Sequence, residues 1–223
     1  MYVTEQILRD LALIKQGSYD KLTGDALDHT IYDEWRFAAT TVRATTTFFS
    51  IGQGGTYGDG TKGLSETNLS DAGRLPSGQG FLVKRISFAL KFNALGTELD
   101  AGECLSDVVS LMQNSVFNLK IAGREFERQI HGTEFLPSIF LAARATIVQA
   151  TDNVFRAGDM LSAGDVKLSA PIAIGDNVGF NVIQYTSAAD ASVQTIVNNA
   201  SNRLATQEAA LQIRLHGTLV RSK

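Results

Sequence analysis

The stretch LQIRLHGTL, residues 211–219, decides the fold of this chain. Apolar and polar side chains alternate along it, with Leu211, Ile213, Leu215 and Leu219 on one side and Gln212, Arg214, His216 and Thr218 on the other. A period of two is typical of an extended strand with one buried face. Such a strand is normally paired within a sheet, so the pattern predicts a half-buried β-strand.

The same signal recurs upstream. Residues 81–92 form a strong strand signal in which Ile86, Phe88, Leu90 and Phe92 alternate with the residues between them, and residues 117–121 alternate in the same way. Residues 44–51 and 178–185 have the β-branched and aromatic composition of strands. Residues 166–174 alternate around Pro171, which indicates an edge strand or a bulge. Residues 139–149 satisfy either period, and we favour a strand. About seven or eight strands without a βαβ rhythm predict a mostly β protein, an antiparallel β-sandwich with a jelly roll or another Greek-key form as candidates.

Two short helices are expected beside the strands. Residues 4–16 carry Ile7, Leu8, Leu11 and Ile14 at helical spacing, and Gly17 stands where a C-cap is expected. This helix would pack on its own domain or on a neighbouring subunit, with a position on a lipid surface as the alternative. A second helix, crossing between strands, is expected over residues 105–112. We therefore divide the chain into an N-terminal helix and arm, 1–40, that serves assembly or faces a particle interior, and a sandwich, 41–223.

Composition and charge narrow the class of protein. The chain has 223 residues, 44% of them hydrophobic and 19% charged, as expected for one folded domain. Its formal net charge is −3, and its first 30 residues hold three cationic and five acidic side chains, so no strong nucleic-acid binding is expected. The single cysteine excludes an intrachain disulfide. No secretory signal or membrane-spanning run is recognisable, which favours synthesis in a cytoplasm.

We recognise no motif for catalysis or cofactor binding in the sequence. The three histidines are far apart in sequence, which does not indicate a metal site. The glycine-rich stretch 52–63 fails the P-loop pattern because Gly63 follows Lys62, and we expect a long mobile surface loop without regular structure. The acidic group Asp25, Asp28, Asp33 and Glu34 is expected to be a solvated flank of a helix. We expect no enzyme activity, cofactor or metal.

Three stretches carry a resemblance to a known family. They are TTTFFSIGQGG at residues 45–55, LSETNLSDAGRLPSGQGFLVKRISFAL at residues 64–90, and AALQIRLHGTLVRSK at residues 209–223. Together they resemble jelly-roll major capsid proteins of tailless icosahedral bacteriophages. The resemblance implies a single jelly roll that oligomerises into trimers, pentamers or hexamers, contacts other capsid proteins and tiles a shell within a virion. It also implies an internal lipid membrane in part of the family.

In such a family, surfaces carry the function, so the candidate site residues are interface residues. We expect interfaces at Ile7, Leu8, Leu11, Ile14, Trp35, Gly54, Gly55 and Tyr57. For Trp35, a place in the core or over a sheet edge is an equal alternative. The alternative function is a receptor- or carbohydrate-binding β-sandwich module of the spike or lectin type.

Overall fold

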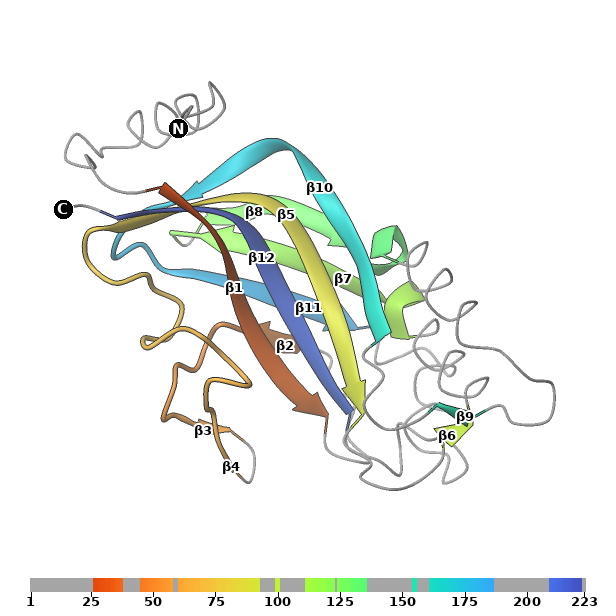
Figure 1. Cartoon of the computed structure of the whole chain (residues 1–223). Coiled ribbons are helices and arrows are strands. Elements are labelled where there is room, and N and C mark those ends of the chain that lie inside the picture. The colour runs from red at the N-terminus through yellow and green to blue at the C-terminus, as the bar shows by residue number, and fades with distance from the viewer. Residues whose placement is uncertain are drawn as a thin grey trace.

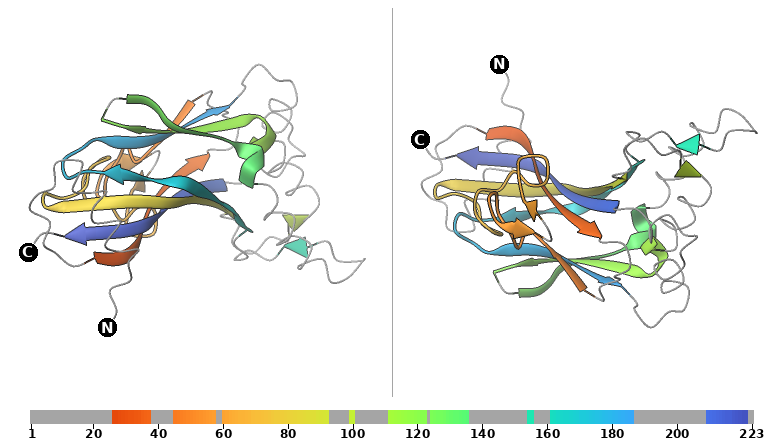
Figure 2. Two further views of the ribbon diagram at one scale, coloured as in Figure 1. Left: turned by 90° about the horizontal axis from the view of Figure 1, so that it is seen from above. Right: turned by 90° about the horizontal axis from the view of Figure 1, so that it is seen from below.

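Two four-stranded antiparallel sheets, here named sheet A and sheet B, form the protein and pack against each other (Figures 1 and 2). The computed structural model describes residues 26–37, 45–57, 60–92, 99–100, 111–122, 124–135, 154–155, 161–186 and 209–221. The chain is mostly β within these ranges, as the sequence predicts. Two packed antiparallel sheets with a shared core are consistent with a β-sandwich.

Sheet A contains the long strands. Its order is β1 (Ala26–Phe37), β12 (Ala209–Arg221), β5 (Gln79–Phe92) and β10 (Leu161–Ile174). The strand that decides the fold, β12, lies inside the sheet and pairs with β1 and β5 over its whole length. Its alternate residues Leu211, Ile213 and Leu215 have no exposed surface, which confirms the predicted buried face.

Sheet B is shorter. Its order is β2 (Thr45–Phe48), β11 (Phe180–Thr186), β7 (Ser115–Ile121) and β8 (Arg124–His131). The strands β11 and β7 match the predicted stretches closely, while β2 ends earlier than the predicted 44–51. Beyond β2 the chain turns at Phe49, which has a φ of 63° and a buried ring. The positive φ ends the strand, because a backbone in the left-handed region is not extended and cannot continue the ladder.

The strand pairs are nested along the sequence. The first long strand pairs with the last (β1 with β12), and inside that pair lie β2 with β11, β5 with β10 and β7 with β8. All of these pairs are antiparallel. Two further pairings, β12 with β5 and β11 with β7, join the nested pairs into the two sheets. Successive pairs thus alternate between sheet A and sheet B.

Small elements complete the described part of the chain. Two-residue strands form two further ladders, β3 (Thr56–Tyr57) with β4 (Gly60–Thr61) and β6 (Leu99–Asp100) with β9 (Val154–Phe155). A 3-10 helix, η1 (Gly132–Phe135), follows β8. Residues 111–113 are helical and precede β7. No helix of the described residues is long and apolar enough to cross a membrane.

An aromatic cluster holds the two sheets together at one end. The ring of Phe88 from β5 lies 6.2 Å from Phe117 of β7 and 5.0 Å from Phe135 of η1, measured between centroids. Phe117 and Phe135 are 5.7 Å apart and nearly perpendicular. All three rings are at most 2% exposed. Offset and edge-to-face packing of this kind contributes about 0.5–1.5 kcal/mol per pair beyond burial, so these rings fasten sheet A to sheet B.

Strand β1 departs from the expected organisation. Residues 26–37 fall in the segment expected to be an arm, yet each of them pairs with a residue of β12. Within the acidic group expected to be solvated, Asp33 and Glu34 are 0% and 3% exposed, so that expectation is wrong for both. The sequence pattern did not predict this strand, because a strand is recognised by apolar residues at alternate positions. One of the inward positions of β1 holds the buried Asp33 instead. The sheet therefore begins at Ala26, inside the expected arm.

A loop covers the outer edge of β1. Asn68 accepts a hydrogen bond from the Tyr32 amide at 3.0 Å and donates one to the Thr30 carbonyl at 2.7 Å. The Thr67 hydroxyl donates to the Tyr32 carbonyl at 3.1 Å. These contacts take the place of a neighbouring strand. Edge strands expose unpaired backbone groups that promote aggregation, so the loop protects this side of sheet A.

The glycine-rich stretch 52–63 contains regular structure, contrary to expectation. It forms the β3–β4 hairpin, with backbone hydrogen bonds from Gly54 to the Lys62 carbonyl at 2.9 Å and from Lys62 to the Gly55 carbonyl at 3.1 Å. The Lys62 side chain is fully buried beside Asp33. Glycine density argues against regular structure only where nothing else holds the backbone. Here a buried ion pair holds it.

Several expectations lie outside the described residues. They are the helix over 4–16, most of the helix over 105–112 and the strand over 139–149. Pro171 does lie in an edge strand, since β10 ends the order of sheet A. The register between β10 and β5 also shifts between Lys167 and Ile172, around this proline. Both consequences expected from Pro171 are therefore confirmed.

Candidate functional site

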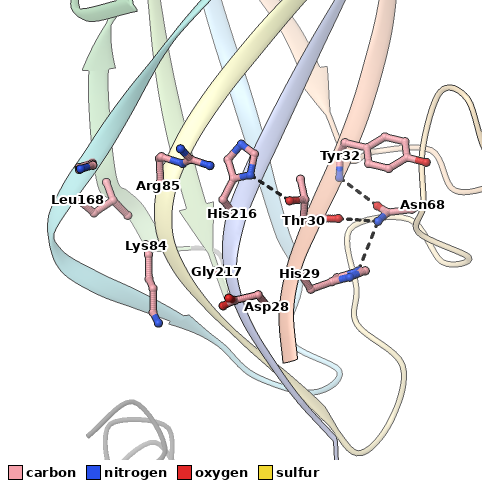
Figure 3. A pocket seen from close by; sticks show the side chains of 11 residues that line it. Asp28, His29, Thr30, Tyr32, Asn68, Lys84, Arg85, Leu168, His216 and Gly217 are labelled. Carbon is pink, nitrogen blue, oxygen red and sulfur yellow. Dashed lines mark hydrogen bonds between the residues drawn. The ribbon is translucent and has the colours of Figure 1, made fainter. Parts of the chain in front are cut away.

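The outer face of sheet A carries a pocket lined by charged, polar and apolar groups. All four strands of the sheet and the covering loop line it, and its volume is about 780 Å³ (Figure 3). The lining residues are Asp28, His29, Thr30 and Tyr32 of β1, Asn68 of the loop, Lys84 and Arg85 of β5, Lys167 and Leu168 of β10, and His216 and Gly217 of β12. The volume lies in the range of small-molecule sites, about 300–1,000 Å³.

A β-bulge in β5 brings two consecutive cations to the pocket. His216 of β12 faces Arg85 and the next residue, Gly217, faces Val83, so Lys84 is the extra residue that the bulge inserts into the ladder. Val83 points into the core with no exposed surface, while Lys84 and Arg85 are both half-buried and line the pocket. In a regular strand these two side chains would point to opposite faces. Bulges re-aim side chains in this way and occur often next to binding sites.

Glycine at position 217 permits the bulge. A Cβ atom built there would lie 1.8 Å from the Leu82 carbonyl oxygen and 3.2 Å from the Val83 Cα atom. Only a residue without a side chain allows the two backbones to come this close. The floor of the pocket thus depends on Gly217.

Three cationic side chains gather on the β5–β10 side of the pocket. They are Lys84, Arg85 and Lys167, and the last two are opposite each other in the ladder. Asp165 of β10 forms an ion pair with Arg85 at 2.7 Å, and both side chains are about two-fifths exposed. Among the residues lining the pocket, the only carboxylate is Asp28, on the far strand β1. This wall of the pocket is therefore electropositive.

His216 links three strands at the centre of the pocket. Its Nδ1 atom lies 3.0 Å from the Thr30 hydroxyl of β1, and its Nε2 atom lies 2.7 Å from the Ser87 hydroxyl of β5. Burial, together with the charges of Arg85 and Arg214 and against the opposing charge of Asp165, lowers the pKa of His216 to about 4. The ring is neutral at pH 7, so it donates through one nitrogen and accepts through the other.

The contact between Ser87 and His216 has the spacing of a nucleophile and its base. The ring nitrogen that faces away from Ser87 meets a hydroxyl, Thr30, where a catalytic triad has a carboxylate. A histidine with a pKa of about 4 is also a poor proton acceptor at neutral pH, because general bases work best with a pKa near the operating pH.

The β1 wall combines His29 with the loop amide of Asn68. Asn68 Nδ2 lies 3.5 Å from His29 Nε2, and the His29 ring meets the edge of Phe81 with centroids 6.5 Å apart. Burial and the charge of Arg221 lower the pKa of His29. Figure 3 shows His29, Thr30 and Asn68 together on this wall. Within the ranges that the structure describes, no three His, Cys, Asp or Glu side chains cluster as metal ligands.

None of the predicted interface residues that the structure describes lines this pocket. Trp35 of β1 is half-buried and packs against the core, in agreement with the alternative stated for it. Gly54 is exposed with a φ of 80°, Gly55 is half-buried in the same hairpin, and Tyr57 belongs to β3. Ile7, Leu8, Leu11 and Ile14 lie outside the described residues. The structure therefore tests none of these residues as interfaces.

Sequence reasoning missed the pocket. The sequence places His216 on the polar face of the last strand, but its neighbours in the pocket on β1, β5 and β10 are 48 to 188 residues away in sequence. One local signal was available. Lys84-Arg85 interrupts the alternation between Val83 and Ile86, and two consecutive polar residues between inward-facing positions are typical of a bulge.

No protein-family model matches the sequence, and no curated protein is significantly similar to it.

Proposed function

We propose that the chain is a jelly-roll subunit of an icosahedral virus shell. The observation that carries the proposal is the nested strand pairing. A jelly roll is an eight-stranded, two-sheet form made of two Greek keys, and a long hairpin of four nested strand pairs that wraps into two sheets has this topology. The orders β1-β12-β5-β10 and β2-β11-β7-β8 support it, since first pairs with last and each inner pair follows in turn. Viral capsid domains are a principal use of this fold.

The packing between the sheets supports a role performed by surfaces. Phe88, Phe117 and Phe135 fill the space between the sheets, and the core cluster continues along both of them. The described cavity lies on the outer face of sheet A instead. A subunit that acts through its exterior fits this arrangement, whereas a jelly roll that encloses its ligand requires interior space. The link from fold to function is an analogy, and the assembly experiment below tests it directly.

The proposal assigns the remaining parts of the chain to assembly. The N-terminal segment contacts neighbouring subunits or the interior of the particle, and the β3–β4 hairpin with Gly54, Gly55 and Tyr57 contacts an adjoining subunit. Partners are further copies of the chain and other capsid proteins, with an internal lipid layer as a further partner of the N-terminal helix. The site of action is the virion.

The state of association of the purified chain tests this proposal. Size-exclusion chromatography with light scattering, followed by negative-stain electron microscopy, should reveal trimers, pentamers, hexamers or closed shells. Removal of residues 1–17 should leave the β-sheet circular dichroism and the cooperative unfolding intact but reduce the assembled fraction. A monomer at all concentrations up to the millimolar range would contradict the proposal. Full assembly of the truncated chain would contradict the role proposed for the N-terminal segment.

A receptor- or carbohydrate-binding module is the second candidate, and the pocket on sheet A is the observation that favours it. Concave sites with a few convergent polar groups bind small ligands. A module of this type would stay small in solution and bind members of a glycan array. Shell assembly and glycan binding are separate measurements, so the two candidates are distinguishable.

A further inference from the structure

We propose that the pocket on the outer face of sheet A binds an acidic saccharide, with its acid group held by Arg85 and Lys167. This inference does not depend on shell assembly, because every lining residue belongs to one copy of the chain. It specifies a ligand class for a site that the shell proposal leaves unused.

The charge of the walls selects an anion. Three cations stand on the β5 and β10 side, and one of them, Arg85, forms its ion pair with a partly exposed carboxylate, Asp165. Two of the five guanidinium N–H donors suffice for one carboxylate oxygen pair, so Arg85 keeps donors for a ligand acid group. Lys167 is exposed opposite Arg85, at the rim of the same wall.

The volume selects a body larger than an inorganic ion. The cavity measures about 780 Å³, whereas a single water molecule occupies about 30 Å³ of liquid. Phosphate or sulfate would therefore leave most of the pocket to solvent. An acid group that carries a ring of sugar size would extend from the β5–β10 side towards β1.

The opposite wall suits a hydroxylated ligand. Asp28 of β1 supplies a carboxylate that accepts hydrogen bonds from hydroxyl groups, while Thr30 and Asn68 supply a hydroxyl and an amide at the same wall (Figure 3). Leu168 contributes an apolar patch for the face of a ring. A site of this kind, apolar in part with a few placed polar groups, fixes the orientation of a small ligand. Because the cations and the carboxylate are on opposite walls, the acid group of the ligand should lie at the β5–β10 wall and its hydroxyl groups at the β1 wall.

Glucuronate and glucose form a matched pair of probes, because they differ by one acid group. Isothermal titration calorimetry of the full chain at low salt should show saturable binding of glucuronate, with glucose at least about tenfold weaker, since a charge-assisted hydrogen bond contributes more than one neutral bond. N-acetylneuraminate should bind at least as well as glucuronate. Raising the ionic strength from about 0.05 to about 0.5 M should weaken the acidic ligands, because partly exposed charges are screened.

The variant that tests the site is Lys167→Gln, and its control is Arg74→Gln. Both positions are exposed, and both changes remove one positive charge, but Arg74 does not line the pocket. Lys167→Gln should raise the Kd for glucuronate about three- to tenfold with an unchanged unfolding transition, and Arg74→Gln should leave the Kd unchanged.

Four results would overturn the inference. They are the absence of glucuronate and N-acetylneuraminate binding, equal affinity for glucose, equal affinity for inorganic sulfate, and equal weakening in Arg74→Gln. Equal binding of sulfate would identify a general anion site without saccharide recognition. None of these outcomes bears on oligomer size, so a failed shell proposal and a failed ligand proposal are separable.

Discussion

Two ion pairs on sheet A have the same length and opposite surroundings. The Lys62 ammonium lies 2.7 Å from Asp33 at the sheet edge, with both side chains 0% exposed. The Arg85 guanidinium lies 2.7 Å from Asp165 on the outer face, with side chains 42% and 38% exposed. The first pair anchors the β3–β4 hairpin to β1, and the second contains Arg85, one of the cations that line the pocket.

Burial, not distance, separates a structural pair from one that remains accessible to a ligand. Burial raises the pKa of the Asp33 carboxyl, while the Lys62 charge and hydrogen bonds from Lys62 and the Phe49 amide lower it in part. The Phe49 amide donates to Asp33 Oδ2 at 2.6 Å, so this carboxylate also holds the turn after β2. The pair joins both sheets and the hairpin, and its partners depend on one another because an isolated buried charge is strongly unfavourable.

The largest effect is expected from breaking the buried pair on one side. Lys62→Met removes the ammonium and leaves Asp33 buried, which should lower the free energy of unfolding by about 3–5 kcal/mol. The double variant Asp33→Asn with Lys62→Met removes both charges and should recover part of that loss, since the carbonyl of the introduced amide can still accept from the Phe49 amide. Urea unfolding followed by circular dichroism measures both. A loss below about 1 kcal/mol in the single variant would show that the hairpin is held by other contacts.

Gly217→Ala tests the bulge in β5 beside Arg85, which belongs to the exposed ion pair. The added Cβ meets the Leu82 carbonyl at 1.8 Å, so the backbones of β12 and β5 must separate, at a cost of about 3 kcal/mol. Gly179→Ala is the control, because a Cβ there has nothing within 4 Å, and it should change stability by less than about 1 kcal/mol. Chemical denaturation compares the two. Equal stability of both variants would contradict the close backbone approach.

Lowering the pH should lower the free energy of unfolding through protonation of His216. The pKa of this ring is lowered to about 4 in the folded protein from 6.5 in the unfolded chain, so the unfolded chain binds a proton first as the pH falls. Its contribution to stability is complete above pH 6.5 and is lost progressively down to about pH 4. Because the ring is partly exposed, we expect a loss of about 1–2 kcal/mol. His216→Gln should remove this component, which urea unfolding at about pH 4.5 and pH 7 detects; the same slope in both proteins would exclude His216 as its source.

The smallest effect is expected from the exposed pair. Arg85→Gln and Asp165→Asn should each change the free energy of unfolding by less than about 1 kcal/mol, because both side chains are solvated. The contrast with Lys62→Met at the same N–O distance sharpens the comparison. Thermal unfolding at low and high salt provides the measurement, and a loss similar to that of Lys62→Met would show that burial does not distinguish the two pairs.

The sequence predicted the strands that are rich in apolar side chains. Alternation identified residues 86–92, 117–121 and 211–219, and β-branched and aromatic composition identified residues 178–185. Strand β1 was missed because its inward positions include Asp33, which a sequence pattern counts as polar. The partner that neutralises Asp33, Lys62, is 29 residues away inside a glycine-rich stretch. No local pattern contains that pairing.

The candidate site could be predicted only in fragments. The sequence shows the doublet Lys84-Arg85 and the polar face of the last strand. Their position beside Thr30 and Lys167 can be known only from the strand order of sheet A. Pro171 predicted both the edge position and the irregularity of β10, since proline cannot donate to a ladder. The bulge itself depends on how β12 and β5 approach at Gly217.

The sequence by itself determined the β class and the buried faces of the regular strands, because alternation is a property of neighbouring residues. Tertiary structure alone decided which strands are neighbours, which charges are buried and where a pocket opens. These depend on pairings such as β1 with β12, whose residues are more than 170 positions apart. The physical reason is that the free energy of strand pairing comes from contacts between two strands, so the sequence of one strand alone does not show which strand it pairs with.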